Sequence, residues 1–258
     1  MSINICTLLG TGTSQGVPVI GCACDVCMSK DVKDARLRSS ALMRIGNVNI
    51  VIDTGPDFRQ QMLHHRVGHL DAIFITHEHN DHVAGLDDIR PYNFMQGKPM
   101  SLFTSRSVIE ELKKKYDYIF ADDKYPGAPS VDLIEIGQES FVVQDILVQP
   151  IHYMHGYMPV LGFRVGDLAY ITDIKSIEEK ELAKLKGVKN LVVGALHHKE
   201  HHSHFNLNEA LSFIRQVNPQ YAYLTHISHA MGLQAAVDES LPKGVHLAYD
   251  GLAFEINL

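Results

Sequence analysis

Cysteine is scarce in this sequence, and three of its four cysteines lie close together in Cys22-Ala23-Cys24-Asp25-Val26-Cys27. A chain of this length that depended on disulfides would carry more cysteines, spread along its length. We therefore expect reduced thiols. The clustered three are available as metal ligands, and Cys6, inside an apolar run, is expected to be a small buried apolar residue.

Long apolar runs and basic tracts are also missing. No segment reaches the roughly 18 apolar residues of a membrane span, and the N-terminal residues lack the basic segment and apolar core of a signal peptide. Lys and Arg total 23 against 30 Asp and Glu, a net charge of −7, and the only dense basic run is Lys113-Lys114-Lys115. We expect a cytoplasmic protein with no membrane contact and no long nucleic-acid partner.

Histidine, in contrast, is abundant, with 16 residues in 258, and it is the side chain that most often binds metals near neutral pH. A hydrophobic content of 45% with 21% charged residues is enough to bury a core. The length fits one large domain or two closely packed halves, and we expect a single domain over residues 1–258.

Apolar segments of strand length recur along the chain and outnumber the helical patterns. We expect strands at 3–9, 48–52, 70–75, 100–103, 141–148, 161–165, 169–171, 191–195, 221–224 and, with breaks, 246–256. Helices are predicted at 107–116, 176–186 and 206–217, each beginning with a serine or asparagine that is followed three residues later by glutamate. Many strands with helices between them indicate an α/β protein whose sheets are covered by helices.

Two apolar segments resemble each other, because Ile50–Asp53 and Ala169–Asp173 both end in an aspartate. The repetition predicts two similar halves that meet near residue 135 and place the carboxylates of Asp53 and Asp173 at the interface between them. The loop at 122–129, which contains two prolines and a glycine, is a candidate boundary. Ordinary turn chemistry after a strand is the alternative explanation of the two aspartates.

The segment Thr76-His77-Glu78-His79-Asn80-Asp81-His82 directly follows the strand predicted at 70–75. Burying three imidazoles and two carboxylates at the end of a buried strand would cost free energy unless these groups bind something. Alternate histidines of an extended segment can point the same way, and Asp81 and His82 can turn toward a second ion. This spacing suits two metal ions, and a polar loop without metal is the alternative.

The pattern His77-x-His79-x-Asp81-His82 resembles the signature of the metallo-β-lactamase superfamily of dinuclear hydrolases, and Asp53-Thr54-Gly55 resembles its strand-end aspartate turn. The resemblance implies a four-layered αββα sandwich of two similar halves, in which Asp53 supports the ligand shell. It also implies three later ligands, namely His155 for the first metal, Asp173 bridging both metals, and His226 for the second.

Two of these assignments have alternatives. His155 is followed by Pro159 and Gly162-Phe163, as in similar proteins, but the gap is slightly longer here and His152 could take its place. Asp173 could instead cap a helix before Ser176. Within the superfamily, His79 and Asp173 disfavour the diiron flavoproteins and the true β-lactamases, which have Glu and Cys at those positions.

The turn at 9–18 and the motif Gly21-Cys22-x-Cys24-x-x-Cys27 resemble the N-terminus of the PhnP-like cyclic phosphodiesterases, which are relatives of ribonuclease Z. In those proteins the three cysteines hold a structural zinc together with a histidine three residues beyond the late catalytic ligand. That histidine is His229 here, and Cys3His is an ordinary closed tetrahedral zinc set. A solvent-facing loop with three free thiols is the alternative.

A run of five histidines lies between residues 197 and 204, and most of them are expected to be solvated. His204 matches the position at which PhnP-like proteins and ribonuclease Z place a histidine near the scissile phosphate. The resemblance therefore implies a catalytic role for His204, and a surface histidine is the alternative.

Taken together, the resemblance implies a dinuclear phosphodiesterase with two catalytic metals, zinc or manganese, and one structural zinc. A metal-bridging hydroxide, oriented by Asp81, would attack phosphorus, while His204 would protonate the leaving oxygen or hold the phosphate. The expected substrate is a small cyclic or short phosphodiester, and a homodimer is one option for assembly. The alternatives are tRNA 3′-end processing like that of ribonuclease Z, thioester, lactone or β-lactam hydrolysis, and metal buffering without turnover.

Overall fold

The apolar segments form two seven-stranded sheets in the computed structural model, which describes residues 3–258. In the first sheet the order is β14-β1-β2-β3-β4-β5-β6. Its strands are β1 (Asn4–Gly10), β2 (Ser40–Ile45), β3 (Val48–Ile52), β4 (Ala72–Phe74), β5 (Met100–Thr104), β6 (Val131–Glu135) and β14 (Ala253–Ile256).

The second sheet has the order β13-β12-β11-β10-β9-β8-β7. Its strands are β7 (Phe141–Val143), β8 (Ile146–His155), β9 (Met158–Val165), β10 (Leu168–Ile171), β11 (Asn190–Gly194), β12 (Tyr221–Thr225) and β13 (Val245–Leu247). The chain passes from the first sheet to the second between residues 135 and 141.

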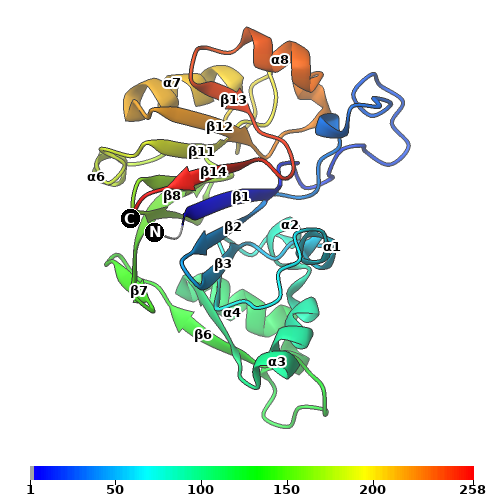
Figure 1. Cartoon of the computed structure of the whole chain (residues 1–258), viewed down its shortest axis with the longest axis vertical. Helices are drawn as coiled ribbons and strands as arrows, with labels where there is room; N and C mark the ends of the chain where they lie inside the picture. Colours follow the sequence, from blue (N-terminus) through cyan, green and yellow to red (C-terminus); the bar gives the residue numbers. More distant parts are fainter. Residues whose placement is uncertain (1–2) are drawn as a thin grey trace.

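Helices cover the outer face of each sheet. They are α1 (Phe58–His64), α2 (Asn80–Val83), α3 (Arg90–Gln96), α4 (Arg106–Lys115), α5 (Asp117–Phe120), α6 (Glu179–Ala183), α7 (Leu207–Val217) and α8 (Gln234–Ser240), with short 3-10 turns at 32–34, 86–89 and 229–231. In Figure 1 the layers run from α7 and α8 at the top, through the two sheets, to α3 and α4 at the bottom. The predicted four-layered αββα sandwich is confirmed.

Three clusters of apolar side chains fill the spaces between the four layers of helices and sheets. Between the sheets, Phe74 of β4 packs against Phe163 of β9, with ring centroids 4.9 Å apart. A second cluster fills the space between the first sheet and α1 to α5, and a third fills the space between the second sheet and α6 to α8. Strands buried on both faces explain the nearly continuous apolar runs in the sequence.

Both sheets contain an antiparallel part followed by a parallel part. In the first sheet β3, β4, β5 and β6 run parallel, and in the second β10, β11, β12 and β13 do so. The carboxyl ends of parallel strands lie at one edge of a sheet, which is where α/β proteins place their sites. The residues that follow β3, β4, β10 and β12 therefore lie at the edges formed by the carboxyl ends of the parallel strands.

Several predicted boundaries differ from the observed ones. The helix predicted at 176–186 is only α6, because Ser176 forms a β-bridge with Met154 and so cannot begin a helix. The strand predicted at 141–148 is broken by a turn at Gln144, whose φ is 52°. The helix predicted from Ser107 starts earlier, with Ser105 as its N-cap. Strands β2 and β6 and helices α1, α2, α3, α5 and α8 were not predicted.

Helix α7 begins as predicted, with a capping box at Asn206. The Asn206 side chain accepts a hydrogen bond from the Glu209 N–H, and the Glu209 carboxylate accepts one from the Asn206 N–H, both at 2.9 Å. Asn206→Ala is expected to cost about 1 kcal/mol of stability, or a fall of about 2–4 °C in Tm for a protein of this size. Asn208→Ala, which changes an exposed residue in the same turn, is the control for thermal unfolding.

Within residues 3–258 we find no helix with the length and apolar character needed to cross a membrane.

Candidate active site

Histidines and aspartates from both sheets meet at the carboxyl ends of the strands. Asp53 follows β3, the segment 77–82 follows β4 and includes the start of α2, Asp173 follows β10, and His226 follows β12. His155 is the last residue of β8. Residues from 53 to 226 of the chain are thus brought together at strand ends, and the two halves contribute to one cluster.

Three of these strand-end residues share an unusual backbone conformation. Asp53, Asp173 and His226 have φ values of 64°, 51° and 56°, in the left-handed region that residues other than glycine rarely occupy. The same turn therefore follows a strand in each half, as the similarity between the segments ending at Asp53 and Asp173 predicts. Strained positions of this kind are concentrated at functional sites, where the surrounding structure holds them in place.

One group of four side chains surrounds a common point. His82 Nε2 lies 3.2 Å from Asp81 Oδ2 and 3.3 Å from Asp173 Oδ2, and His226 Nε2 lies 3.4 Å from Asp81 Oδ2 and 3.2 Å from Asp173 Oδ1. A tetrahedral zinc about 2.0–2.1 Å from each nitrogen or oxygen separates neighbouring ligand atoms by about 3.3 Å. The four side chains therefore have the spacing of a metal-binding set.

A second group lies beside the first. His77 Nε2 is 3.1 Å from His79 Nδ1, and the His155 ring centroid is 5.8 Å from that of His77 and 5.3 Å from that of His79. A nitrogen of His155 and a carboxylate oxygen of Asp173 also lie within 4.8 Å of each other. Asp173 is thus next to both groups, the position expected of a bridging carboxylate.

Of the two candidate histidines on β8, only His155 reaches this cluster. Its Nδ1 donates a hydrogen bond to the Ser203 carbonyl at 2.7 Å, so Nε2 is left free for a ligand. His152 lies elsewhere, with its Nε2 at 3.0 Å from the Gly137 carbonyl and its backbone N–H donating to Glu181. Asp173 likewise does not cap a helix, since α6 begins only at Glu179.

This geometry predicts different results for two histidines on one strand. His155→Ala should remove bound metal and lower hydrolytic turnover at least about tenfold, because losing a ligand affects a metal site more than losing a supporting contact does. His152→Ala should leave both unchanged. Metal content per chain, measured for both variants after equal dialysis, checks the prediction, and equal losses would contradict it.

Further side chains hold the candidate ligands in orientation. Asp53, completely buried, accepts a hydrogen bond from His82 Nδ1 at 2.7 Å and one from the Thr76 N–H at 2.9 Å. The Thr76 hydroxyl lies 2.9 Å from His77 Nδ1. Such contacts fix which nitrogen faces a metal. The roles of Thr76 and of the Ser203 carbonyl were missed, because a threonine in a motif and a backbone oxygen carry no distinctive sequence signal.

The chemistry of this donor set fits divalent metal ions. His82 Nε2 is buried and has no hydrogen-bond partner among residues 3–258, although it points at two carboxylates. Burial opposes ionisation of Asp81 and Asp173, but the neighbouring imidazoles outweigh it and hold the pKa of both carboxyls below the usual range. Burial also lowers the pKa of His77, which leaves the neutral imidazole that binds metals.

His204 lies against the same cluster. Its Nδ1 is 3.3 Å from Asp173 Oδ1, and its ring centroid is 4.3 Å from that of His155 and 4.9 Å from that of His226. Burial and the nearby His226 lower the pKa of His204 to about 2. Of the other four histidines of the 197–204 run, His198 and His202 are exposed and His197 and His201 are half-buried, and His198 Nε2 donates a hydrogen bond to the Met231 carbonyl.

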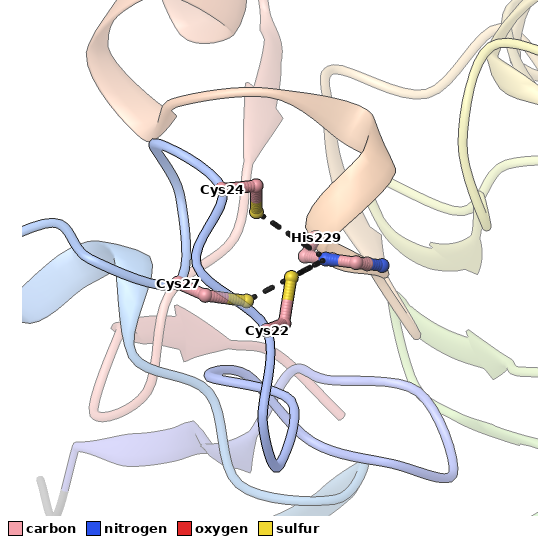
Figure 2. Close-up of side chains that lie close together, drawn as sticks. All are labelled: Cys22, Cys24, Cys27 and His229. Atoms are coloured by element: carbon pink, nitrogen blue, oxygen red, sulfur yellow. Dashed lines mark hydrogen bonds between the residues drawn. The ribbon is translucent and has the colours of Figure 1, made fainter.

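The three clustered cysteines converge on His229 (Figure 2). The Sγ atoms of Cys22, Cys24 and Cys27 lie 3.3, 3.4 and 3.5 Å from His229 Nδ1. A tetrahedral zinc about 2.3 Å from sulfur and 2.0–2.1 Å from nitrogen separates these atoms by about 3.6 Å, so the four side chains fit a closed zinc site. The Cys27 N–H and His229 lower the pKa of the Cys24 thiol to about 6, which favours the thiolate that binds metal.

Comparison with known proteins agrees with this geometry. Residues 48–227 match the family described as Beta-lactamase superfamily domain. The crystal structure of a diphosphatase from the PhnP family superimposes with a TM-score of 0.92 and 36% sequence identity, covering 99% of this chain and 98% of that one. Zinc-bound PqqB from Methylobacterium extorquens, at 18% identity and a TM-score of 0.79, covers 98% of this chain and 100% of its own and shares the fold.

Curated relatives were also found. An octanoyltransferase of Porphyromonas gingivalis is 40% identical over 250 residues, which are 96% of this chain and 50% of that protein. Ribonuclease Z of Staphylococcus saprophyticus is 26% identical over 151 residues, 54% of this chain and 48% of that protein. This chain spans about half the length of these curated relatives. The matched family and the PhnP-family structure together establish that the chain belongs to the beta-lactamase superfamily and, within it, to the PhnP family.

Proposed function

We propose that this protein is a dinuclear, metal-dependent phosphodiesterase that acts on small cyclic or short phosphodiesters. The observation that carries the proposal is the pair of ligand groups that share Asp173, since two adjacent divalent ions are the usual machinery for phosphoryl hydrolysis. The similar PhnP-family structure is that of a diphosphatase, which supports a substrate with a phosphoryl centre.

In this proposal His77, His79 and His155 would hold one ion, and Asp81, His82 and His226 the other, with Asp173 between them. When bound, the ions would polarise the phosphoryl oxygens and lower the pKa of a coordinated water. Zinc or manganese would suit these ligands.

The protein's own groups position the reaction. Asp81, at the start of α2, would orient the attacking water. The oxygen of that water would form a bond to phosphorus while the bond from phosphorus to the leaving oxygen breaks. His204, beside Asp173, would contact the leaving oxygen or a phosphoryl oxygen. The carboxylate of Asp53 keeps His82 oriented throughout.

A small substrate is favoured over a transfer RNA. The net charge of −7 and a single short basic run, at 113–115, provide few contacts for a long phosphate backbone. Two of those three lysines are occupied, since Lys114 pairs with Glu111 and Lys115 with the Asn80 side chain. The proposed partner is therefore a small phosphodiester rather than a long nucleic acid.

The similarity to an octanoyltransferase suggests a different reaction, acyl transfer or thioester hydrolysis. The described site offers imidazoles and carboxylates, while Cys6 is fully buried in the core and the other three cysteines surround His229. A free thiol nucleophile at the metal cluster is therefore missing from residues 3–258. We rank acyl chemistry second and include it in the test.

The test combines metal analysis with a substrate panel. We expect about three metal ions per chain, and turnover of bis(p-nitrophenyl) phosphate, a 2′,3′-cyclic nucleotide and a ribose cyclic phosphate. Octanoyl and lactoyl thioesters and nitrocefin should be much poorer substrates. Preferred turnover of a thioester would contradict the proposal, and full metal occupancy without turnover of any ester would indicate a metal-buffering protein.

A further inference from the structure

A lysine close to the metal cluster makes contacts that the proposed reaction does not use. Lys175 lies two residues after Asp173, the carboxylate placed between the two ligand groups. Its Nζ donates a hydrogen bond to Glu209 Oε1 at 2.7 Å and lies 3.5 Å from the carbonyl oxygen of His204. The Lys175 side chain is only 25% exposed, so its ammonium group is held against the protein instead of extending into water.

Glu209 connects this lysine to the loop that carries His204. Its Oε1 accepts the hydrogen bond from Lys175, and its Oε2 accepts one from the Asn206 N–H at 2.9 Å. One carboxylate thus ties the segment after β10 to the first turn of α7, which begins three residues beyond His204. An ion pair that belongs to such a hydrogen-bond network holds its groups more firmly than an isolated surface pair does.

The backbone of the loop also contacts the segment that carries Lys175. The Phe205 N–H donates a hydrogen bond to the Ile174 carbonyl at 2.7 Å, so residues 204 and 205 both contact residues 174 and 175. A shift of the backbone at residue 204 would move the His204 ring relative to Asp173, whose Oδ1 lies 3.3 Å from His204 Nδ1. Lys175 is therefore placed to act on the His204 ring through the backbone of the loop.

We propose that Lys175 is a positioning residue for the hydrolysis, which holds the loop at 203–206 so that the His204 ring faces Asp173. The proposal rests on the phosphodiesterase function proposed above, in which His204 contacts the leaving oxygen or a phosphoryl oxygen. Groups that act on the reacting atoms must be held close to their productive position, and a displacement of about 1 Å can cost about 10²-fold in rate. Lys175 acts through His204 and does not itself touch the reacting atoms.

The first measurement is turnover of bis(p-nitrophenyl) phosphate. Lys175→Met keeps the aliphatic part of the side chain and removes the ammonium group, so kcat should fall about tenfold while KM stays within about twofold. Lys175→Arg, which retains a cation able to reach Glu209, should keep most of the wild-type kcat. In a His204→Ala background Lys175→Met should have little further effect, because two residues that act together are not additive. An equal loss of kcat with and without His204 would overturn the proposal.

Lys184→Met is the matched control. The Lys184 side chain is 20% exposed, pairs with the Glu181 carboxylate at 2.9 Å and donates to the Pro150 carbonyl at 3.2 Å, so its contacts are of the same kinds as those of Lys175. Its partners lie in α6 and β8 and not in the loop that carries His204. Lys184→Met should therefore leave kcat unchanged in both backgrounds.

Hydrogen exchange separates this inference from the proposed function. The N–H groups of Ser203, Phe205 and Leu207 donate hydrogen bonds within the loop and to its neighbours, so their exchange with deuterium reports how firmly the loop is held. Exchange in a peptide covering 203–207 should be several-fold faster in Lys175→Met and unchanged in Lys184→Met. Faster exchange in a protein that turns over no phosphodiester would keep Lys175 as the residue that holds this loop and reject the phosphodiesterase. Unchanged exchange and unchanged kcat in Lys175→Met would overturn the inference and retain the phosphodiesterase.

Discussion

Asp173→Asn is expected to lower kcat/KM for phosphodiesters by about 10³-fold, the range seen when one preorganised electrostatic contact is removed from an active site. Asparagine keeps the size of the side chain and tolerates the left-handed backbone at this position, where φ is 51°. The variant should therefore fold. What it loses is the negative charge next to both ligand groups, so bound metal should also fall below two catalytic ions per chain.

A second buried aspartate provides the control. Asp167 precedes β10 and Asp173 follows it, so the two lie at opposite ends of this strand, and Asp167 accepts two hydrogen bonds from Asn257. Asp167→Asn should change stability but neither metal content nor kcat/KM. Atomic emission analysis and initial rates on bis(p-nitrophenyl) phosphate measure both quantities. Retention of full turnover by Asp173→Asn with metal bound would remove Asp173 from the proposed mechanism.

Cys27→Ser is expected to release one zinc per chain and to lower Tm by roughly 5–15 °C, since loss of a structural metal is among the largest single-residue effects. The Cys27 side chain belongs to the group around His229 and also accepts a hydrogen bond from the Val19 N–H. The site connects the loop at 22–27 to the 3-10 turn at 229–231, three residues after His226. Losing it should loosen the rim of the active site and lower activity indirectly.

Cys6→Ala tests whether this effect belongs to the cluster or to any cysteine. Cys6 is fully buried in β1, and burial raises the pKa of its thiol to about 12, so it is a poor metal ligand. Its replacement should cost some packing energy but no zinc. If Cys27→Ser kept the wild-type zinc content and Tm after chelator treatment, the structural zinc site would be rejected.

The local parts of the site could be predicted from the sequence because their signals are local. The spacing of His77, His79, Asp81 and His82 after an apolar strand indicates metal ligands, and the closely spaced cysteines indicate a second site. Capping of α7 at Asn206 was predicted for the same reason, since a capping box involves residues only three positions apart. By contrast, the cap expected at Ser176 was wrong, because a long-range bridge to Met154 outweighs a local preference.

Short elements whose sequence lacks a clear hydrophobic periodicity were not predicted either. Helix α2 has four residues and lies inside the ligand motif, and α5 is equally short. Their stability comes from tertiary contacts, such as the hydrogen bond from the Tyr116 hydroxyl to the Val83 carbonyl, and not from their own sequence.

The sequence by itself indicated the types of the candidate ligands and an α/β protein with helix-covered sheets, because strand periodicity and ligand spacing are properties of neighbouring residues. The family and its four-layered sandwich followed from the resemblance of the motifs. Only the tertiary structure decided which histidine of β8 faces the cluster, that Asp173 lies between two ligand groups, and that Ser203 orients His155. These facts depend on strand register and on loops that meet from residues far apart in the chain. A change of one residue in register would turn a side chain to the opposite face of the sheet, and no local pattern fixes that choice.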